Sequence, residues 1–597
     1  MKVFSGIRIS NLEQRPGISI LLWTFLWSSC GCSDNSQTKS NPELSESKSE
    51  PMFSEITAEA GIDRTHKVTP QPDFPMPQIM GSGCALVRLN EDELLDILLV
   101  PGEPPASSEQ DGRAICAVLI QSEDGRFADV SEKAGLAVAG FGMGVFPADI
   151  DNDGDIDILL TGSAGVTLFR NDGDLQFRDV SESAGVASSR WATAAVFFDY
   201  NRDGWLDLLV VNYVDYFPGS VCEDGSGRRD YCGPLSFEGT ADLLYRNLGG
   251  EGQPGIFEDV TVISGLAGGK GKGLGAVCSD MNDDGLPDIY VANDMEANRL
   301  WIQDAAGHFQ DEANLRGCSV DLNGRPQASM GTAWADFDLD GQHDIFLTHL
   351  RGETNTMYRQ VLPGVFLDQT ATTGLGEASL NFTGFGVVAR DLDLDGWIDL
   401  TIVNGRVMRS ALLNPTAAES HWGEYAERNQ LFMGDSEGRF RELAPSTDPF
   451  LQSVEVSRGL AAGDIDHDGD IDLLVTNTAA PARLFRNVAP RKGHWLSVQA
   501  DDPLVKRDSP GAVIIVNAAG NQRRSEVQPY VGYLSTQDSR VHFGLGPTDR
   551  YESIEVIWPH GPRGIERFSG GPADRVLRLE RGTGIAADEV DAGGVTK

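Results

Sequence analysis

The densest group of carboxylates in the sequence is the stretch ADIDNDGDIDILL, residues 148–160. Its five aspartates fall within nine positions and are Asp149, Asp151, Asp153, Asp155 and Asp157. Two unit charges about 4 Å apart repel by roughly 1 kcal/mol in water and by about 4 kcal/mol at an effective dielectric of 20. The spacing therefore predicts a loop that gathers oxygen ligands around a cation.

The same nine-residue pattern occurs six times along the chain. The copies begin at Asp149, Asp199, Asp280, Asp336, Asp391 and Asp464. Their starts are 50 to 81 residues apart, which suits a repeat of four strands with loops of variable length. A worn copy, RLNEDELLD, starts at Arg88 and has Glu93 in place of the glycine. Because arginine offers no acceptor oxygen, we expect no metal there and expect the guanidinium to pair with Asp92 or Asp96.

The loops begin like an EF-hand, Asp-x-Asp-x-Asp-Gly, but the last acid is at position 9 and a β-branched run follows. Position 7 varies among Asp, Trp, Leu and Gln, which suits a backbone carbonyl ligand. Hard oxygen donors in a flexible loop favour Ca²⁺, about six ions in all, and the alternative is a set of solvated acidic turns without metal. Asn201 and Asn282 each replace an acid, so weaker binding is expected in their loops. The candidate ligands, from positions 1, 3, 5, 7 and 9, are Asp149, Asp151, Asp153, Asp155, Asp157, Asp199, Asn201, Asp203, Trp205, Asp207, Asp280, Asn282, Asp284, Leu286, Asp288, Asp336, Asp338, Asp340, Gln342, Asp344, Asp391, Asp393, Asp395, Trp397, Asp399, Asp464, Asp466, Asp468, Asp470 and Asp472.

The segments around each loop predict an all-β fold. A glycine-rich strand enters the loop, a β-branched strand leaves it, and two aromatic-containing strands follow, as in one propeller blade. The unit that starts at Asp464 lacks its fourth strand, whereas FSEIT, residues 53–57, precedes the first loop without a blade of its own. We therefore expect a seven-bladed β-propeller over residues 52–490, closed by the N-terminal strand and followed by a small β-rich domain.

These loops and strands resemble the FG-GAP repeats of integrin-like propellers. The segments KRDSPGAVIIV, GYLSTQDSRVHFGLG and IEVIWPHG, within residues 491–581, resemble the ASPIC/UnbV module found in cartilage acidic protein and in many bacterial surface proteins. Residues 582–597 read as a polar tail. The resemblance implies a secreted or surface-tethered calcium-binding protein with no established catalysis, and it does not name a ligand.

Composition and the N-terminus limit the location and the partners. The 597 residues hold 48 Lys and Arg against 89 Asp and Glu, a formal charge of −41 that disfavours nucleic acid as a partner. Residues 1–32 read as an export signal, in which the apolar run 18–27 is too short to span a bilayer. We favour a bacterial lipoprotein lipidated at Cys30 or Cys32, with residues 33–51 as a polar linker, located in the periplasm, at the outer membrane or at the cell surface. The alternative is a cleaved signal peptide and secretion.

Two cysteines lie close together in an exported chain. Cys222 and Cys232 sit in VCEDGSGRRDYCGP, and we expect them to form a disulfide. Four further cysteines are expected either as buried thiols or as further disulfides, and they are Cys84, Cys116, Cys278 and Cys318.

Two long insertions, residues 212–242 and 404–429, must lie on the propeller face opposite the aspartate loops, which we call the insertion face. The same face should receive five charged or polar residues, read either as a recognition surface or as solvated loop tips: His349, Arg351, Glu353, Arg406 and Arg409. No catalytic constellation is visible in the sequence. We expect a binding module for a glycan, matrix or protein ligand; the alternative is a propeller polysaccharide-degrading enzyme of lyase type.

Overall fold

The structure is a computed structural model that describes residues 51–90, 92–103, 113–413, 420–445, 448–561 and 564–586. The predicted export signal with Cys30 and Cys32, nearly all of the polar linker, and residues 587–597 lie outside the described residues. In the part of the chain that is described, no helix has both the length and the apolar character needed to cross a bilayer.

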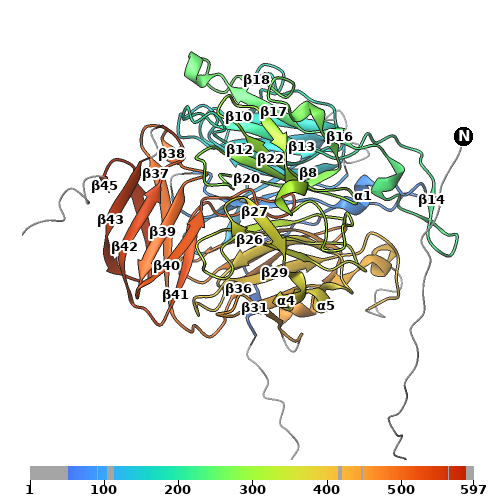
Figure 1. Cartoon of the computed structure of the whole chain (residues 1–597). Coiled ribbons are helices and arrows are strands. Elements are labelled where there is room, and N and C mark those ends of the chain that lie inside the picture. The colour runs from blue at the N-terminus through green and yellow to red at the C-terminus, as the bar shows by residue number, and fades with distance from the viewer. Residues whose placement is uncertain are drawn as a thin grey trace, which may run out of the picture. The chain divides into compact units, whose positions relative to one another are not determined.

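Between Phe53 and Asn487 the described chain forms seven four-stranded antiparallel sheets (Figure 1). Their strands are β2 (Cys84–Val87), β3 (Asp96–Leu99), β5 (Ala117–Gln121), β6 (Phe127–Asp129); β8 (Gly142–Ala148), β9 (Asp157–Gly162), β10 (Gly165–Asn171), β11 (Phe177–Asp179); β12 (Ala192–Phe198), β13 (Asp207–Asn212), β17 (Leu243–Asn247), β18 (Phe257–Asp259); β20 (Gly273–Ser279), β21 (Asp288–Asn293), β22 (Arg299–Gln303), β23 (Phe309–Asp311); β24 (Thr332–Ala335), β25 (Asp344–Leu347), β26 (Thr356–Leu362), β27 (Val365–Asp368); β28 (Gly384–Arg390), β29 (Asp399–Asn404), β31 (Gln430–Gly434), β32 (Phe440–Glu442); and β34 (Ser457–Gly463), β35 (Asp472–Asn477), β36 (Arg483–Asn487), β1 (Phe53–Glu55). The prediction of an all-β fold with four strands per repeat is confirmed.

The first strands of these sheets line the axis of a closed ring. Each contacts the first strand of the next sheet, in the order β2, β8, β12, β20, β24, β28, β34 and back to β2. The β-branched second strands are buried along their whole length, as in DILLTG of β9, because neighbouring sheets cover both faces. The last sheet takes β1 as its fourth strand, with Phe53 opposite Asn487, as the sequence predicted. This pairing covers an edge that would otherwise be exposed.

Short elements fill the connections between the described strands. The two-stranded sheets are β4 (Arg113–Ile115) with β7 (Ala137–Ala139), β14 (Cys222–Glu223) with β15 (Arg229–Asp230), β16 (Thr240–Ala241) with β19 (Lys270–Gly271), and β30 (Glu427–Arg428) with β33 (Val454–Glu455). The helices are α1 (Pro77–Met80), α2 (Ser131–Ala134), α3 (Ala313–Arg316), α4 (Thr370–Thr373), α5 (Leu375–Ser379) and α6 (Pro449–Gln452).

The C-terminal domain is built from two packed sheets, drawn in orange to red in Figure 1. One contains β37 (His494–Asp502), β38 (Arg507–Asp508), β41 (Val541–Gly546) and β44 (Arg575–Glu580); the other contains β39 (Val513–Ala518), β40 (Asn521–Glu526), β42 (Arg550–Ile557), β43 (Ile565–Pro572) and β45 (Ile585–Ala586). Alternate residues such as Val498 of β37, Ile514 of β39 and Ile554 of β42 are fully buried in one core. The domain is therefore a β-sandwich, with the period-two burial of two facing sheets.

A segment of the C-terminal domain fills the axis of the ring. Residues 528–538, called the plug below, connect β40 to β41. Within the plug, Tyr533 is completely buried, and its ring lies 4.9 Å from that of Phe385 on β28, at 67° to it. A Cβ on Gly83, just before β2, would lie 1.6 Å from the carbonyl oxygen of Leu534. Only glycine allows so close an approach between the plug and the first sheet.

Contacts of the plug reach the first strand of every propeller sheet. The backbone amides of Leu86 (β2) and Thr332 (β24) donate to plug carbonyls, each at 3.1 Å. Beyond Phe385, the remaining contacts join Tyr530 to Pro147 (β8) and Phe197 (β12), Gln528 to Cys278 (β20), and Gln537 to Leu460 (β34). The axis is thus packed with side chains of the plug, and the two domains form one hydrogen-bonded body around it.

The closing strand generates a first prediction. Phe53 is completely buried, and its ring centroid lies 5.6 Å from that of Phe450. Truncating such an aromatic core residue costs about 3–5 kcal/mol. We expect Phe53→Ala to lower the free energy of unfolding by that amount in a urea titration, whereas Phe217→Ala, at a side chain that is 58% exposed, changes it little. Equal stability of Phe53→Ala and the parent chain would show that β1 does not complete the ring.

Candidate metal centres

Each aspartate loop joins the first two strands of a sheet, as Asp149 follows β8 and Asp157 begins β9. The loop is turned by Asn152 at position 4 and Gly154 at position 6, whose φ angles are 56° and 102°. Gly154 also donates its backbone N–H to Asp149 Oδ2 at 3.0 Å. The other five loops repeat this bond through Gly204, Gly285, Gly341, Gly396 and Gly469 at 2.7 to 3.0 Å. The repeated sequence therefore dictates one repeated local structure.

The aspartate at position 9 ties its loop to the third strand of the sheet. Asp157 Oδ2 accepts the backbone N–H of Ile150 at 3.0 Å, and its Oδ1 accepts that of Asn171 on β10 at 2.8 Å. The same two bonds are made by Asp207, Asp288, Asp344, Asp399 and Asp472. Asp96 makes them in the worn loop as well, at 3.0 and 2.8 Å. The position-9 carboxylate therefore joins the loop to the third strand even where the first acid of the loop is missing.

Four of the loops bring three carboxylates together with one oxygen of each within 4.8 Å of the others. These groups are Asp149, Asp151 and Asp157; Asp336, Asp338 and Asp340; Asp391, Asp393 and Asp399; and Asp464, Asp466 and Asp472. Asp149 and Asp393 are 2% and 4% exposed, and the Oδ1 atom of each is buried without a hydrogen-bond partner. A buried carboxylate oxygen without a partner is costly, and a cation among these oxygens would remove the cost. These aspartate clusters could hold metal ions.

Burial shifts the titration of the loop carboxyls. Desolvation, with a smaller contribution from neighbouring aspartates of the same loop, raises the pKa of Asp157 to about 8 and that of Asp391 to about 7. Desolvation likewise raises the pKa of Asp472 well above its usual value. Carboxyls with such values hold protons near neutral pH unless a positive charge stabilises the ionised form.

The two loops with asparagine differ from these four. Asn201 Nδ2 donates to Asp203 Oδ2 at 3.0 Å, and Asn282 Nδ2 donates to Asp284 Oδ2 at the same distance. An amide donor thus occupies a carboxylate oxygen that an aspartate would leave for a cation. At position 7, by contrast, all six loops agree whatever the side chain: the backbone N–H donates to Oδ1 of position 5 at 2.8 to 3.1 Å.

The expectation for Arg88 is wrong in its choice of partner. Its guanidinium pairs with Asp508 of the C-terminal domain at 2.5 Å and lies 3.9 Å from Asp538, not beside Asp92 or Asp96. Asp96 is unavailable because both of its oxygens accept backbone N–H groups. The worn loop therefore meets the C-terminal domain through an ion pair.

On the insertion face, two of the predicted surface residues are buried. His349 is 1% exposed and Arg406 is 5% exposed, and Arg406 Nε donates to Glu427 Oε1 at 3.0 Å. Their predicted role on the surface is wrong because both fill the interior beneath the loops. Arg351 stays exposed and donates to Ser410 Oγ at 2.9 Å. Glu353 Oε2 accepts the backbone N–H of Ala328 at 2.9 Å.

Arg409 joins the two insertions. It donates to the carbonyl of Arg229 at 2.6 Å, and its guanidinium lies 4.9 Å from the ring centre of Phe74. Tyr425 OH donates to Asp230 Oδ1 at 2.5 Å, and the structure contains the disulfide between Cys222 and Cys232. The four other described cysteines are buried free thiols. The aromatic residues in the segments DYCGP and HWGEY indicate that each insertion could pack against a partner. Their contact with each other could not be predicted, because it depends on how the closed propeller places the two insertions.

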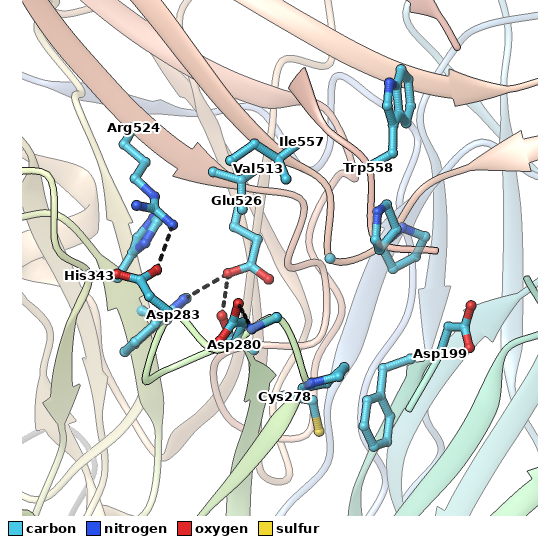
Figure 2. Close-up of a pocket in the computed structure, with 18 of the residues that line it drawn as sticks. Asp199, Cys278, Asp280, Asp283, His343, Val513, Arg524, Glu526, Ile557 and Trp558 are labelled. Atoms are coloured by element: carbon cyan, nitrogen blue, oxygen red, sulfur yellow. Dashed lines mark hydrogen bonds and ion pairs between the residues drawn. The ribbon is translucent and has the colours of Figure 1, made fainter. Parts of the chain in front are cut away.

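A pocket beside the loop at Asp280 lies between the propeller and the C-terminal domain (Figure 2). Glu526 of β40 points into it and accepts hydrogen bonds from Ser279 Oγ at 2.6 Å and Trp334 Nε1 at 3.0 Å. Burial raises the pKa of Glu526 to about 7. Gln528 of the plug also donates to Glu526, at 2.9 Å. This carboxyl thus has partners in both domains, so the pocket belongs to their junction, which sequence patterns gave no means of locating.

Comparisons with known proteins agree with this architecture. Residues 505–586 match the ASPIC and UnbV family model, and residues 88–160, 149–210 and 280–347 match the FG-GAP-like repeat model. The chain is therefore an FG-GAP-repeat protein with a C-terminal ASPIC/UnbV domain. These matches confirm the resemblance seen in the sequence.

Among curated relatives, cartilage acidic protein 1 of Xenopus tropicalis is 26% identical over 326 residues, which are 52% of this chain and 45% of the relative. The Homo sapiens protein is 24% identical over 324 residues, 53% of this chain and 45% of the relative. The match thus spans slightly less than half the length of these relatives. A solved structure of an Agrocybe aegerita lectin that recognises terminal N-acetylglucosamine aligns with a TM-score of 0.36 and 15% identity, covering 65% of this chain and 83% of the lectin. At that score the likeness says nothing about a ligand of this chain.

The position-9 bonds predict a stability effect that does not depend on metal. In Asp96→Asn an amide donor would face a backbone N–H, and a buried group left without its hydrogen bond costs about 1–3 kcal/mol. We expect that loss in the free energy of unfolding to be equal in chelator and in excess calcium, whereas the loss for Asp399→Asn is larger in calcium. If chelator abolished the effect of Asp96→Asn, the worn loop would be a metal site.

Proposed function

We propose that this protein is an exported, non-catalytic calcium-binding protein that recognises a glycan, matrix or protein ligand through its propeller. The observation that carries the metal part is the pair of buried, unpartnered Oδ1 atoms of Asp149 and Asp393 inside loops of oxygen donors. Ca²⁺ accepts six to eight oxygens in a flexible geometry, whereas Mg²⁺ demands a strict octahedron. The candidate ligands include no cysteine or histidine, so zinc and copper are disfavoured.

Calcium would be held by positions 1, 3, 5 and 9 and by the carbonyl of position 7 in each of six loops. When bound, it supplies the positive charge that keeps the buried carboxyls ionised. The loops of Asn201 and Asn282 should bind more weakly, because an amide already donates to a carboxylate there. Since the ion binds the folded chain far better than the unfolded one, it also stabilises the ring.

The insertion face is the surface that the fold leaves for recognition. The C-terminal domain contacts the aspartate loops, and the plug fills the axis. On the insertion face, Arg409 and Tyr425 tie the second insertion to the first, and Phe217 and Met408 are 58% and 59% exposed. Exposed apolar side chains on braced loops are suited to contact with a partner.

The alternative, a polysaccharide-degrading enzyme of lyase type, needs a base and an acid that converge in an open cleft. His349 was the histidine predicted on the insertion face, and it is buried with both ring nitrogens unpartnered. Burial lowers its pKa to about 3, so it stays neutral and out of reach of a substrate. This placement supports the non-catalytic proposal.

The export part of the proposal rests on the sequence alone. Residues 1–32 would direct export, Cys30 or Cys32 would carry the lipid, and residues 33–51 would tether the propeller of residues 52–490 and the domain of residues 491–581, with a polar tail at 582–597. The protein would lie in the periplasm, at the outer membrane or at the cell surface, or be secreted. It would touch a membrane only through the lipid and would not bind nucleic acid, because its formal charge is −41.

Metal analysis tests the calcium sites. We expect dialysed protein to retain or rebind six equivalents of calcium, four of them tightly. The double variant Asp391→Asn/Asp393→Asn should bind one equivalent fewer, and Glu132→Gln, an exposed carboxylate on α2, should bind as many as the parent. If the double variant bound as many ions as the parent, the loop would not be a calcium site.

A glycan and matrix-protein array probed with calcium-loaded protein tests the recognition part. We expect a ligand whose binding weakens at least about tenfold in Phe217→Asp, as for a central interface residue, and is unchanged in Leu315→Asp, whose side chain is 81% exposed elsewhere on the propeller. A ligand indifferent to Phe217→Asp would place recognition on another surface.

A further inference from the structure

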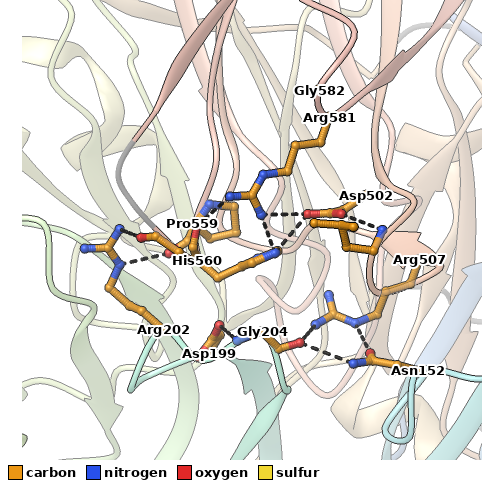
Figure 3. Close-up of polar contacts among 12 residues, drawn as sticks. Asn152, Asp199, Arg202, Gly204, Asp502, Arg507, Pro559, His560, Arg581 and Gly582 are labelled. Carbon is orange, nitrogen blue, oxygen red and sulfur yellow. Dashed lines mark hydrogen bonds and ion pairs between the residues drawn. The ribbon is translucent and has the colours of Figure 1, made fainter. Parts of the chain in front are cut away.

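The C-terminal domain contacts the tips of the aspartate loops directly (Figure 3). Arg507 donates to Asn152 Oδ1 at 3.0 Å and to the carbonyl of Gly204 at 3.1 Å, so one guanidinium bridges two neighbouring loops. Arg202, at position 4 of the second loop, donates to the carbonyls of Pro559 and Gly561 at 3.1 and 2.9 Å. The Gly204 carbonyl belongs to the backbone of its loop, and Asn152 and Arg202 both lie at position 4, so these bonds depend on how the two loops are folded.

The C-terminal domain also contacts the other four intact loops, at positions 3, 4 or 6. Arg524 lies 3.5 Å from Asp283 at position 4 of the third loop and donates to the carbonyl of Gly341 in the fourth at 3.4 Å. The backbone N–H of Lys492 donates to the carbonyl of Asp393 at 2.8 Å, and His542 Nε2 lies 2.9 Å from the carbonyl of Gly469. All six intact loops therefore meet the C-terminal domain.

Charge favours the same docking. Residues 491–586 contain thirteen Lys and Arg against eleven Asp and Glu, in a chain whose formal charge is −41. A nearly neutral, slightly basic domain thus faces the acidic loops. At the worn loop the charges are exchanged: the propeller supplies the cation, Arg88, and the C-terminal domain supplies the anion, Asp508.

The loop contacts and the plug share the same strands. Arg524 lies on β40, which leads into the plug, and His542 lies on β41, which leaves it. Inside the ring, the backbone N–H groups of Thr536 and Asp538 donate to the propeller carbonyls of Cys84 and Ala462 at 2.9 and 3.1 Å. The loop tips and both ends of the plug are therefore linked through β40 and β41.

We propose that metal occupancy of the aspartate loops controls the docking of the C-terminal domain, so that loss of the ions undocks residues 491–586 and withdraws the plug from the axis. This rests on the proposed function, because it needs the loops to bind calcium. Without the ion, the oxygens of each loop lose the cation that would gather them, so the turn that presents the carbonyls of Gly204, Gly341 and Gly469 is held only by its backbone hydrogen bonds. The plug and the loop contacts then fail together, and the axis opens to solvent.

Hydrogen–deuterium exchange of the full-length protein, with calcium and then with chelator, tests this proposal. We expect exchange of the amides of Thr536 and Asp538 to rise at least about tenfold in chelator. Amides that join β39 to β42 inside the C-terminal sandwich, such as those of the Ile514–Val556 pair, should stay protected and show that the domain itself is folded. Bound metal with unchanged exchange in the plug would overturn the proposal, whereas absence of any bound metal would overturn the proposed function instead.

A variant separates docking from metal binding. Arg202→Ala/Arg507→Ala removes loop contacts without removing a carboxylate, so in calcium it should raise exchange of the plug at an unchanged number of bound ions. Arg178→Ala, on the outer strand β11, removes only an exposed guanidinium that pairs with Asp172, and should behave as the parent does. Unchanged plug exchange in the double variant would show that the arginine contacts do not hold the domain, and the chelator experiment on the parent chain decides the proposal if the variant fails to fold.

Discussion

The structure depends on how the repeated loops deal with their own negative charge. Each intact loop buries its position-9 aspartate at the start of a strand, and five of the six also bury the position-1 aspartate, so desolvation opposes ionisation there. Backbone N–H groups satisfy the oxygens that hold the turn, and Oδ1 atoms such as those of Asp149 and Asp393 remain for a cation. The same arrangement of hydrogen bonds recurs in all six intact loops, and it sets the positions of the strands that enter and leave each loop.

This arrangement also determines which surfaces of the propeller the C-terminal domain covers. The loop face is occupied by the C-terminal sandwich, and the axis is occupied by the plug with Tyr533 at its centre. Under the proposed function the binding surface then lies on the insertion face, where Asp230 joins the two insertions and a disulfide closes a loop within the first. The same packing argues against chemistry in a central channel.

Much of this could be predicted from sequence because the signal is local and repeated. The aspartate spacing, the β-branched second strands and the missing fourth strand of the last sheet indicated the blades and the pairing of β1 with β36. Exposure could not be predicted: His349 and Arg406 lie in polar stretches that look like loop tips, yet the ring buries them. Arg88 was assigned a partner in its own loop because a partner some 420 residues away leaves no trace in spacing. The plug was missed for the same reason, since GYLSTQDS shows no period that marks insertion into an axis.

The central claim is that calcium lies inside the six intact loops and is absent from the worn one. Anomalous diffraction from crystals grown in calcium tests this most directly, because it locates each ion without reference to stability or binding. The account predicts peaks within the loops that start at Asp149, Asp199, Asp280, Asp336, Asp391 and Asp464, weakest at the two that contain asparagine, and none beside Arg88. Loops without peaks, or a peak at the worn loop, would contradict it.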